Sequence, residues 1–224
     1  AAGMFELWLA GRARSGGEAF DPGIGSRSGG LTVVVATDII PYDDEGGSGR
    51  VAWETARRLA AKGHKIIVFT RGGPGRKDIE TADGIAVYRY SGNPFKFRAA
   101  ASAVLRRYGK VEVLELHHPY TALMALHYFK GVPAVYNFHS PWGEEYAIRG
   151  ADLNRTPLRV KLGTISRTFL ERSALKASSV ILNASRFMSG RLMDVHGLRS
   201  KIVDLGVNTA KFSPAAAIAG LRRK

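Results

Sequence analysis

Short apolar segments alternate with amphipathic helical segments from residue 31 onward, and this alternation restricts the fold more than any other feature of the chain. Strands are predicted at residues 31–37, 64–70, 83–90, 111–118, 132–139, 178–185 and 201–207, and helices at 50–62, 95–108, 120–129, 157–176 and 186–196. Strands that alternate with helices favour a doubly wound α/β fold, a mainly parallel sheet with helices on both faces. Right-handed crossovers are expected between its parallel strands.

The composition fits a soluble protein with one α/β domain or a pair of small ones. The chain has 224 residues, of which 45% are hydrophobic and 23% charged. No segment holds the roughly 18 uninterrupted apolar residues of a membrane-spanning helix. It contains no cysteine, which excludes disulfides, thiolate zinc sites and cysteine nucleophiles and fits a reducing, cytoplasmic location.

A strong positive charge indicates anionic partners. The net charge is +14 and the pI is near 10.3. Residues 155–211 hold 11 Lys and Arg against three acidic residues, and most of this excess is expected to be solvated surface. No nucleic-acid partner is expected, because Phe169, Phe187 and Phe212 fall at predicted core positions instead of lying among the basic residues as RNA-stacking aromatics do.

The domain organisation follows from where the pattern begins. Residues 1–30 hold eight of the 26 glycines without a sustained period, and we interpret them as a disordered leader or remnant. The α/β domain is predicted at 31–214, and residues 215–224 are expected to start a linker.

A glycine-rich turn precedes the first predicted helix. Ligands of such sheets lie where the strands end and the helices begin, so Gly46 and Gly47 are candidates for binding an anion through backbone N–H groups. The spacing of "GGSGR" matches neither the dinucleotide fingerprint nor a Walker A loop. By spacing alone, an anion site and a flexible turn remain equally open.

Histidines close two of the predicted strands. His117 and His118 end one strand and His139 ends another, near Glu144 and Glu145, so at least two are expected to face one cleft. No short His and Glu spacing typical of zinc sites is present, and no metal is expected. Three further histidines are interpreted as structural: His64, His127 and His196.

Five segments, in order, resemble the amino-terminal domain of the family 4 retaining glycosyltransferases. They are "GGSGRVAWETARRLAAKGHKIIVFTR", "ADGIAVYRY", "LELHHPYTALMAL", "GVPAVYNFHSPWGEE" and "ERSALKASSVILNASRFMSGRLMDVHGLRSKIVDLGVNTAKFSP". The resemblance covers about residues 31 to 214. It departs from the family at "DLGVN" (204–208), where the family usually has "PNGVD".

The resemblance implies the amino-terminal, acceptor-side half of a GT-B fold, with two Rossmann-like domains facing across a cleft. It implies sugar transfer from a nucleotide-diphosphate sugar to a hydroxyl of a glycan, lipid-linked or small-molecule acceptor, with retained configuration and without metal or other cofactor; alone, this half would be inactive. The implied site residues are catalytic His139, donor-binding Gly46, Gly47 and Ser48, and acceptor-side His118, Glu144, Glu145, Asn183 and Ser185.

The segment 157–176 suggests a further partner. Its basic residues lie outside a stripe of Leu158, Leu162, Ile165 and Phe169. Basic helices bind anionic membranes weakly, so a peripheral contact with the inner face of the membrane is a further hypothesis. Two other functions stay open: a nucleotide- or glycan-binding module without turnover, and an epimerase of the same fold acting on a sugar nucleotide.

Overall fold

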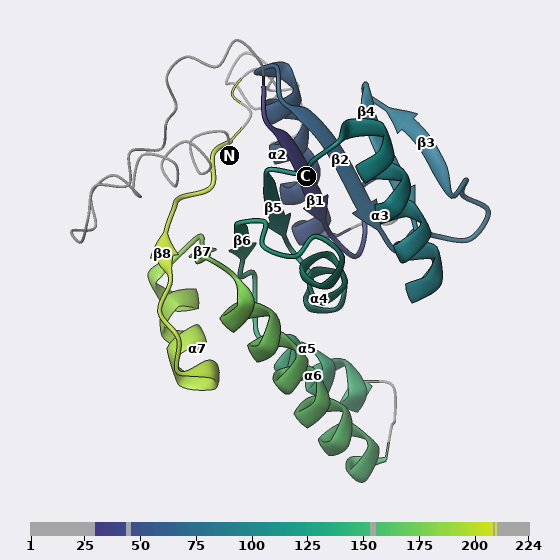
Figure 1. Ribbon diagram of the computed structural model, residues 1–224. Coiled ribbons are helices and arrows are strands. Elements are labelled where there is room, and N and C mark those ends of the chain that lie inside the picture. The colour runs from purple at the N-terminus through teal and green to yellow at the C-terminus, as the bar shows by residue number, and fades with distance from the viewer. Residues whose placement is uncertain (1–29, 44–45, 153–155, 208, 210–224) are drawn as a thin grey trace, which may run out of the picture.

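The computed structural model describes residues 30–43, 46–152, 156–207 and 209, and its centre is an eight-stranded sheet. The strand order is β3-β4-β2-β1-β5-β6-β7-β8 (Figure 1). The strands are β1 (Thr32–Ala36), β2 (Lys65–Thr70), β3 (Ile79–Ala82), β4 (Ile85–Arg89), β5 (Val113–Leu116), β6 (Ala134–Asn137), β7 (Val180–Asn183) and β8 (Lys201–Ile202). The described helices are α2 (Gly47–Ala61), α3 (Pro94–Tyr108), α4 (Pro119–Tyr128), α5 (Trp142–Asp152), α6 (Pro157–Ala177) and α7 (Arg186–His196).

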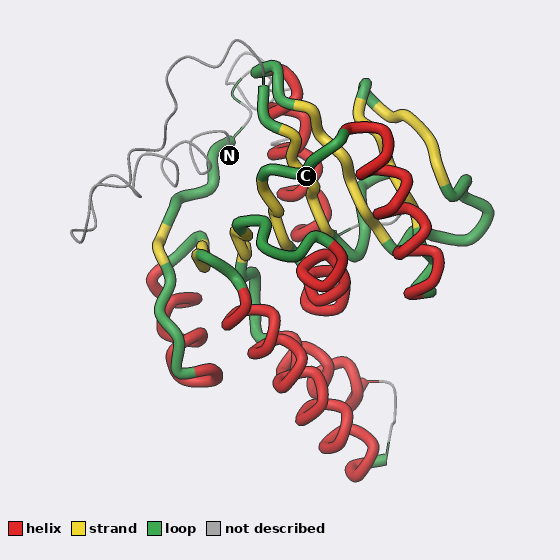
Figure 2. The backbone as a smooth tube through the Cα atoms, viewed as in Figure 1, coloured by secondary structure: helices red, strands yellow, loops and turns green. Residues whose placement is uncertain are grey.

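Helices lie on both sides of the sheet, which confirms the predicted fold class (Figure 2). Consecutive side chains of a strand point to opposite faces. Val33 and Val35 of β1 pack in one cluster with Trp53 of α2. Val34 and Ala36 belong to the opposite cluster, whose helical members come from α3, α4, α6 and α7. Two apolar layers therefore hold a central sheet that is hidden from solvent on both faces.

Every predicted helix and strand is present, and apart from α2 and β8 their ends differ from the prediction by at most two residues. Helix α2 begins at Gly47, not Arg50, so the glycine-rich turn forms its first turn. Helix α5 was not predicted. Strand β8 has two residues instead of the predicted seven. Of the predicted leader only Gly30 is described, and the linker at 215–224 lies outside the described residues, as do 210–214 at the end of the predicted domain.

One antiparallel strand, β3, was missed and flanks the parallel part of the sheet. Asp83 and Gly84 both have positive φ angles (50° and 76°), which a two-residue hairpin turn of this hand needs, and the turn joins β3 to β4. From β4, buried Arg89 reaches the segment after β1: its Nε lies 3.0 Å from both carboxylate oxygens of Asp43. A second nitrogen lies 2.6 Å from Glu80 of β3. This ion-paired cluster holds the chain that leads from β1 to α2.

The orientation of α6 corrects a prediction. Leu158, Leu162, Ile165 and Phe169 share one face as predicted, but they are 57–69% exposed and face away from the core; we call these four the outward row. The opposite face of α6 packs on α5, and the pair projects from the sheet (Figure 1). A Cβ on Gly143 of α5 would collide with Thr168, and one on Gly163 would collide with Tyr146. Glycines therefore let the two helices approach closely, and the large apolar residues are left outside.

A matched pair of substitutions tests this orientation. Leu114 of β5 is fully buried, so Leu114→Ala should lower the free energy of unfolding by about 2–5 kcal/mol. Leu162→Ala in the outward row should change it by at most about 0.5 kcal/mol. Urea denaturation of both variants measures the difference, and a large loss from Leu162→Ala would contradict the exposed position.

Candidate functional site

A cleft opens at the carboxyl edge of the sheet, where β1, β2, β5 and β6 end. Its volume is about 420 Å³. It is lined by Asp38, Ile39, Gly46, Gly47, Ser48, Arg71, His117, His118, Pro119, Tyr136, His139, Ser140, Trp142, Glu145, Arg149 and Glu171. The register explains this gathering, since Ala36 of β1 pairs with both Phe69 of β2 and Leu116 of β5. The strands thus end level, and the residues after them meet.

The glycines at one side of the cleft differ in what they do. Gly46 is the N-cap of α2 and supplies no side-chain cap, and the first turn carries no acidic residue. A Cβ on Gly49 would lie 2.7 Å from the carbonyl oxygen of Ile39, so packing requires glycine there. A Cβ on Gly47 would meet nothing within 4 Å. The N-terminal N–H groups of α2 and the open space at Gly47 together suit an anion.

Opposite the glycines lies a buried chain of hydrogen bonds that we call the histidine relay: Glu115, His117 and His139. Glu115 Oε1 is 3.0 Å from Nε2 of His117, and Nδ1 of His117 is 3.0 Å from Nε2 of His139. Burial, and secondarily the neighbouring His117, lowers the pKa of His139 from 6.5 to about 3. His139 is therefore neutral at physiological pH and lies at the cleft as a polar, uncharged group.

His118 caps the start of α4 and lies at the floor of the cleft. Its ring stands edge-on to Trp142, with ring centres 4.9 Å apart. Nδ1 of His118 is 3.9 Å from a carboxylate oxygen of Asp38, which is too long for a hydrogen bond. Burial lowers the pKa of His118, and the charge of Asp38 opposes that shift. This nitrogen is buried and has no hydrogen-bond partner within the described residues.

The two adjacent glutamates of α5 have different surroundings. Glu145 lines the cleft and accepts a hydrogen bond from the hydroxyl of Ser140. Glu144 pairs with Arg191 of α7 and does not line the cleft.

The remaining two predicted residues lie outside the cleft and stabilise the region around α7. The amide of Asn183 donates to the hydroxyl of Ser200 at 2.6 Å, and its oxygen accepts from the backbone N–H of Ser185. The hydroxyl of Ser185 caps α7 by accepting from the N–H of Met188 at 3.1 Å. The structure thus gathers Gly46, Gly47, Ser48, His118, His139 and Glu145 at one cleft and does not place Glu144, Asn183 or Ser185 there.

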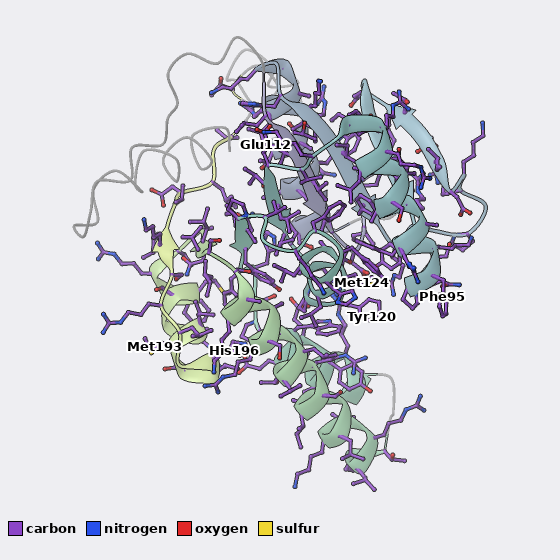
Figure 3. All side chains as sticks on the ribbon, in the orientation of Figure 1. Phe95, Glu112, Tyr120, Met124, Met193 and His196 are labelled. Atoms are coloured by element: carbon purple, nitrogen blue, oxygen red, sulfur yellow. The ribbon has the colours of Figure 1, made fainter. Side chains whose placement is uncertain are left out.

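Several lining residues were not among the sequence candidates. Arg71 directly follows β2 and pairs with Asp38 at 2.7 Å, so its strand-end position alone would have indicated it. Glu171 of α6 accepts from the backbone N–H of Trp142 at 3.0 Å and pairs with Nε2 of His196 at 2.9 Å. Figure 3 shows His196 between α7 and α6. Burial raises the pKa of Glu171. Its signal in the sequence is weak, a single acid within a basic helix.

The described residues contain neither a cluster of metal-binding side chains nor a membrane-spanning helix. Within residues 30–43, 46–152 and 156–207, no group of three or more His, Asp or Glu side chains is placed to hold a metal ion. None of the described helices combines the length and hydropathy needed to cross a bilayer.

Comparison with known proteins relates this site to one family. Residues 45–211 match the model of Glycosyltransferase Family 4. Among solved structures, sucrose-phosphate synthase from Thermosynechococcus elongatus is similar, with a TM-score of 0.63, 17% identity and coverage of 82% of this chain and 50% of that one. The catalytic domain of starch synthase IV from Arabidopsis thaliana, bound to ADP and acarbose, is also similar, with a TM-score of 0.50 and 16% identity. The match covers 84% of this chain and 54% of that one.

At 16–17% identity these two similarities show the fold alone. The chain spans about half the length of each synthase. A comparison with curated protein sequences finds no match.

The low pKa of His139 predicts a pH dependence of stability. In the unfolded chain His139 becomes protonated below about pH 6.5, whereas in the folded chain it becomes protonated only near pH 3. The free energy of unfolding therefore falls as the pH falls from 6.5 to 3. Between pH 7 and 5 the wild type should lose about 2 kcal/mol more than His139→Gln in urea denaturation. His127→Gln, at an exposed position of α4, is the control. If the free energy of unfolding fell by the same amount in the wild type and in His139→Gln, the lowered pKa of His139 would be contradicted.

Proposed function

The chain belongs to Glycosyltransferase Family 4, and from this membership we propose that it is the acceptor-side half of a retaining glycosyltransferase of GT-B fold. The proposed reaction transfers a sugar from a nucleotide-diphosphate sugar to an acceptor hydroxyl. Two findings support the assignment to one half of the fold: the family match, and the fact that the chain covers about half of each of the two larger synthases. A second α/β half would then complete the donor site, and this chain alone would not turn over.

The observation that carries the proposal is the juxtaposition of His139 with a helix N-terminus whose N-cap residue, Gly46, supplies no side-chain cap; both line one cleft. The N–H groups of Gly47 and Ser48 are placed to stabilise charge that develops on a leaving diphosphate. Arg149 and Arg71, the latter paired with Asp38, also line the cleft, together with the acidic Glu145 and Glu171. In the proposed reaction, hydrogen-bond donors of the helix N-terminus and the arginines stabilise the diphosphate, without a metal or other cofactor.

The proposed chemistry assigns two sides to the cleft. The bond from the anomeric carbon to the diphosphate breaks, the acceptor oxygen bonds to that carbon, and the hydroxyl proton passes to the released diphosphate. His139 would contact the donor sugar near the reacting carbon. His118 and Glu145 would orient the acceptor hydroxyl, and both line the cleft. Glu144, Asn183 and Ser185 are not part of this proposal, because they do not line the cleft.

A further part of the proposal is a cytoplasmic location with a peripheral contact with an anionic membrane, and the outward row supports that contact. Exposed Arg159, Lys161, Arg172 and Lys176 border the outward row, and the acidic residue of α6, Glu171, is buried on the opposite face. Four basic residues supply about 4 kcal/mol near an anionic surface, which alone corresponds to a dissociation constant of about 1 mM. Useful binding would therefore require insertion of the outward row as well.

A pair of glycine substitutions tests the donor site. We expect Gly47→Val to lower nucleotide release from the preferred sugar nucleotide at least about tenfold, since its side chain would occupy space that we assign to the diphosphate. Gly190→Val on α7 is the matched control, because a Cβ there also meets nothing within 4 Å and the site does not line the cleft. Both variants should unfold at urea concentrations close to the wild type.

The assay uses the chain together with any sequence that its gene encodes after Lys224, a panel of sugar nucleotides, and His139→Ala as a second site variant. Release that Gly47→Val and His139→Ala both leave unchanged would contradict the site. No release with any donor would favour the binding module. Conversion of the sugar nucleotide without an acceptor would favour the epimerase.

Vesicle sedimentation tests the membrane contact. The protein should pellet with phosphatidylglycerol-containing vesicles at low salt, less at high salt, and not with neutral phosphatidylcholine vesicles. Phe169→Glu in the outward row should abolish pelleting, whereas Phe95→Glu, at an equally exposed aromatic of α3, should not. Equal pelleting of both variants would remove the outward row from the contact. Self-association that Phe169→Glu abolishes, without vesicle binding, would assign this surface to a second copy of the chain.

A further inference from the structure

The hydrogen bonds of the histidine relay have a direction that the chemistry of its three groups determines. An ionised carboxylate accepts hydrogen bonds and donates none. Glu115 Oε1, 3.0 Å from Nε2 of His117, therefore requires the proton on that nitrogen. The amide of Asn137 competes weakly, since its nitrogen lies 3.4 Å from both Oε1 and Nε2. Its donation to Oε1 agrees with a carboxylate that only accepts.

The direction continues to the second histidine. A neutral imidazole carries one N–H, so a proton on Nε2 of His117 leaves Nδ1 of that ring as an acceptor. Nε2 of His139 lies 3.0 Å from this acceptor and must donate to it. The single proton of neutral His139 is thereby used inside the protein. Its Nδ1 is left with a lone pair, and the structure records no protein hydrogen bond to this nitrogen among the described residues.

We infer that Glu115 is a positioning residue that fixes the proton on Nε2 of His139 and so turns Nδ1 of His139 into a hydrogen-bond acceptor for a hydroxyl of the sugar substrate. The identity of that substrate rests on the proposed function. The cleft would then favour sugars that present an O–H at this point and disfavour analogues with an ether or fluorine there, because two acceptors face each other without a proton.

The burial of Glu115 agrees with a role beyond stability. Its side chain is almost inaccessible in the middle of the sheet, and its second oxygen, Oε2, has no hydrogen-bond partner within the described residues. A half-satisfied buried carboxylate lowers stability compared with an apolar residue of similar size. An apolar side chain, however, would leave the protons of both histidines undirected.

Nuclear magnetic resonance of the chain with ¹⁵N-labelled histidine rings tests the direction without any sugar nucleotide. At pH 8, above the ordinary histidine pKa of about 6.5, the bridging proton should show its one-bond coupling to Nε2 of His139 and a smaller coupling across the hydrogen bond to Nδ1 of His117. Nε2 of His117 should also carry a proton. A bridging proton on Nδ1 of His117, or protons on both nitrogens of that ring, would overturn the inference.

Variants separate direction from mere packing. Glu115→Gln presents an amide that can donate or accept, so the Nδ1 resonances of both rings should move toward the average of protonated and unprotonated nitrogens. Glu54→Gln, an exposed ion-paired glutamate of α2, is the control and should leave the spectrum unchanged. Asn137→Ala should also leave the direction unchanged. A wild-type-like spectrum of folded Glu115→Gln would overturn the role of Glu115, and the amide spectrum reports whether the variant is folded.

The release assay adds a functional readout. Glu115→Gln should lower nucleotide release to a rate between wild type and His139→Ala, and an unchanged rate would overturn the functional half of the inference. Because the ring spectra involve no turnover, a protein that fails to transfer sugar still shows whether the relay has the assigned direction.

Discussion

The level ending of the parallel strands is the constraint on which the cleft depends. Hydrogen-bond ladders place Ala36 of β1 beside Phe69 and Leu116, and Leu116 beside Tyr136 of β6. His117, one step beyond Leu116, therefore lies next to the end of β6 and within reach of its histidine. Since the side-chain period of a strand is two, a slip of one residue would turn His117 to the other face of the sheet. Both apolar faces prevent that slip, because it would also expose the Val-rich strands.

The fold and part of the lining of the cleft could be predicted because both follow from local patterns. A buried Val run, a helix stop at Gly63 and apolar positions at helical spacing fix the order of elements, and the order fixes which loops share an edge. Gly46, Gly47 and His139 were expected at this edge for that reason, and all three line the cleft. Helix α5 was not, since its first turn follows a proline and carries two glutamates that also suit a loop. Strand β3 has only four residues and none of them is fully buried, so its alternation of exposed and half-buried residues is too short and too weak to mark a strand.

The packing face of α6 and the hydrogen-bond partners of Glu115 could not be predicted from the sequence, because both depend on tertiary contacts. Periodicity shows that Leu158 and Phe169 share a face of α6, but which face packs is decided by the partner helix, and close contact through Gly163 turns that face outward. Likewise, Glu115 looks like one polar residue in an apolar strand. Its meaning depends on two ring nitrogens that folding brings within 3.0 Å of one another. Tertiary contacts of this kind leave no mark on local spacing.

Two opposite faces of helix α6 belong to different surfaces of the protein, the wall of the cleft and the outward row. Glu171 on its inner side forms part of the cleft wall and holds the start of α5 through the N–H of Trp142, while the outward row occupies the opposite side. An α-helix of 21 residues is stiff over its length, so it cannot bend at one surface and stay still at the other. A displacement of α6 as a rigid body would therefore move the outward row and the wall of the cleft together. The face that we propose for a membrane contact and the cleft that we propose for the substrate share this one helix.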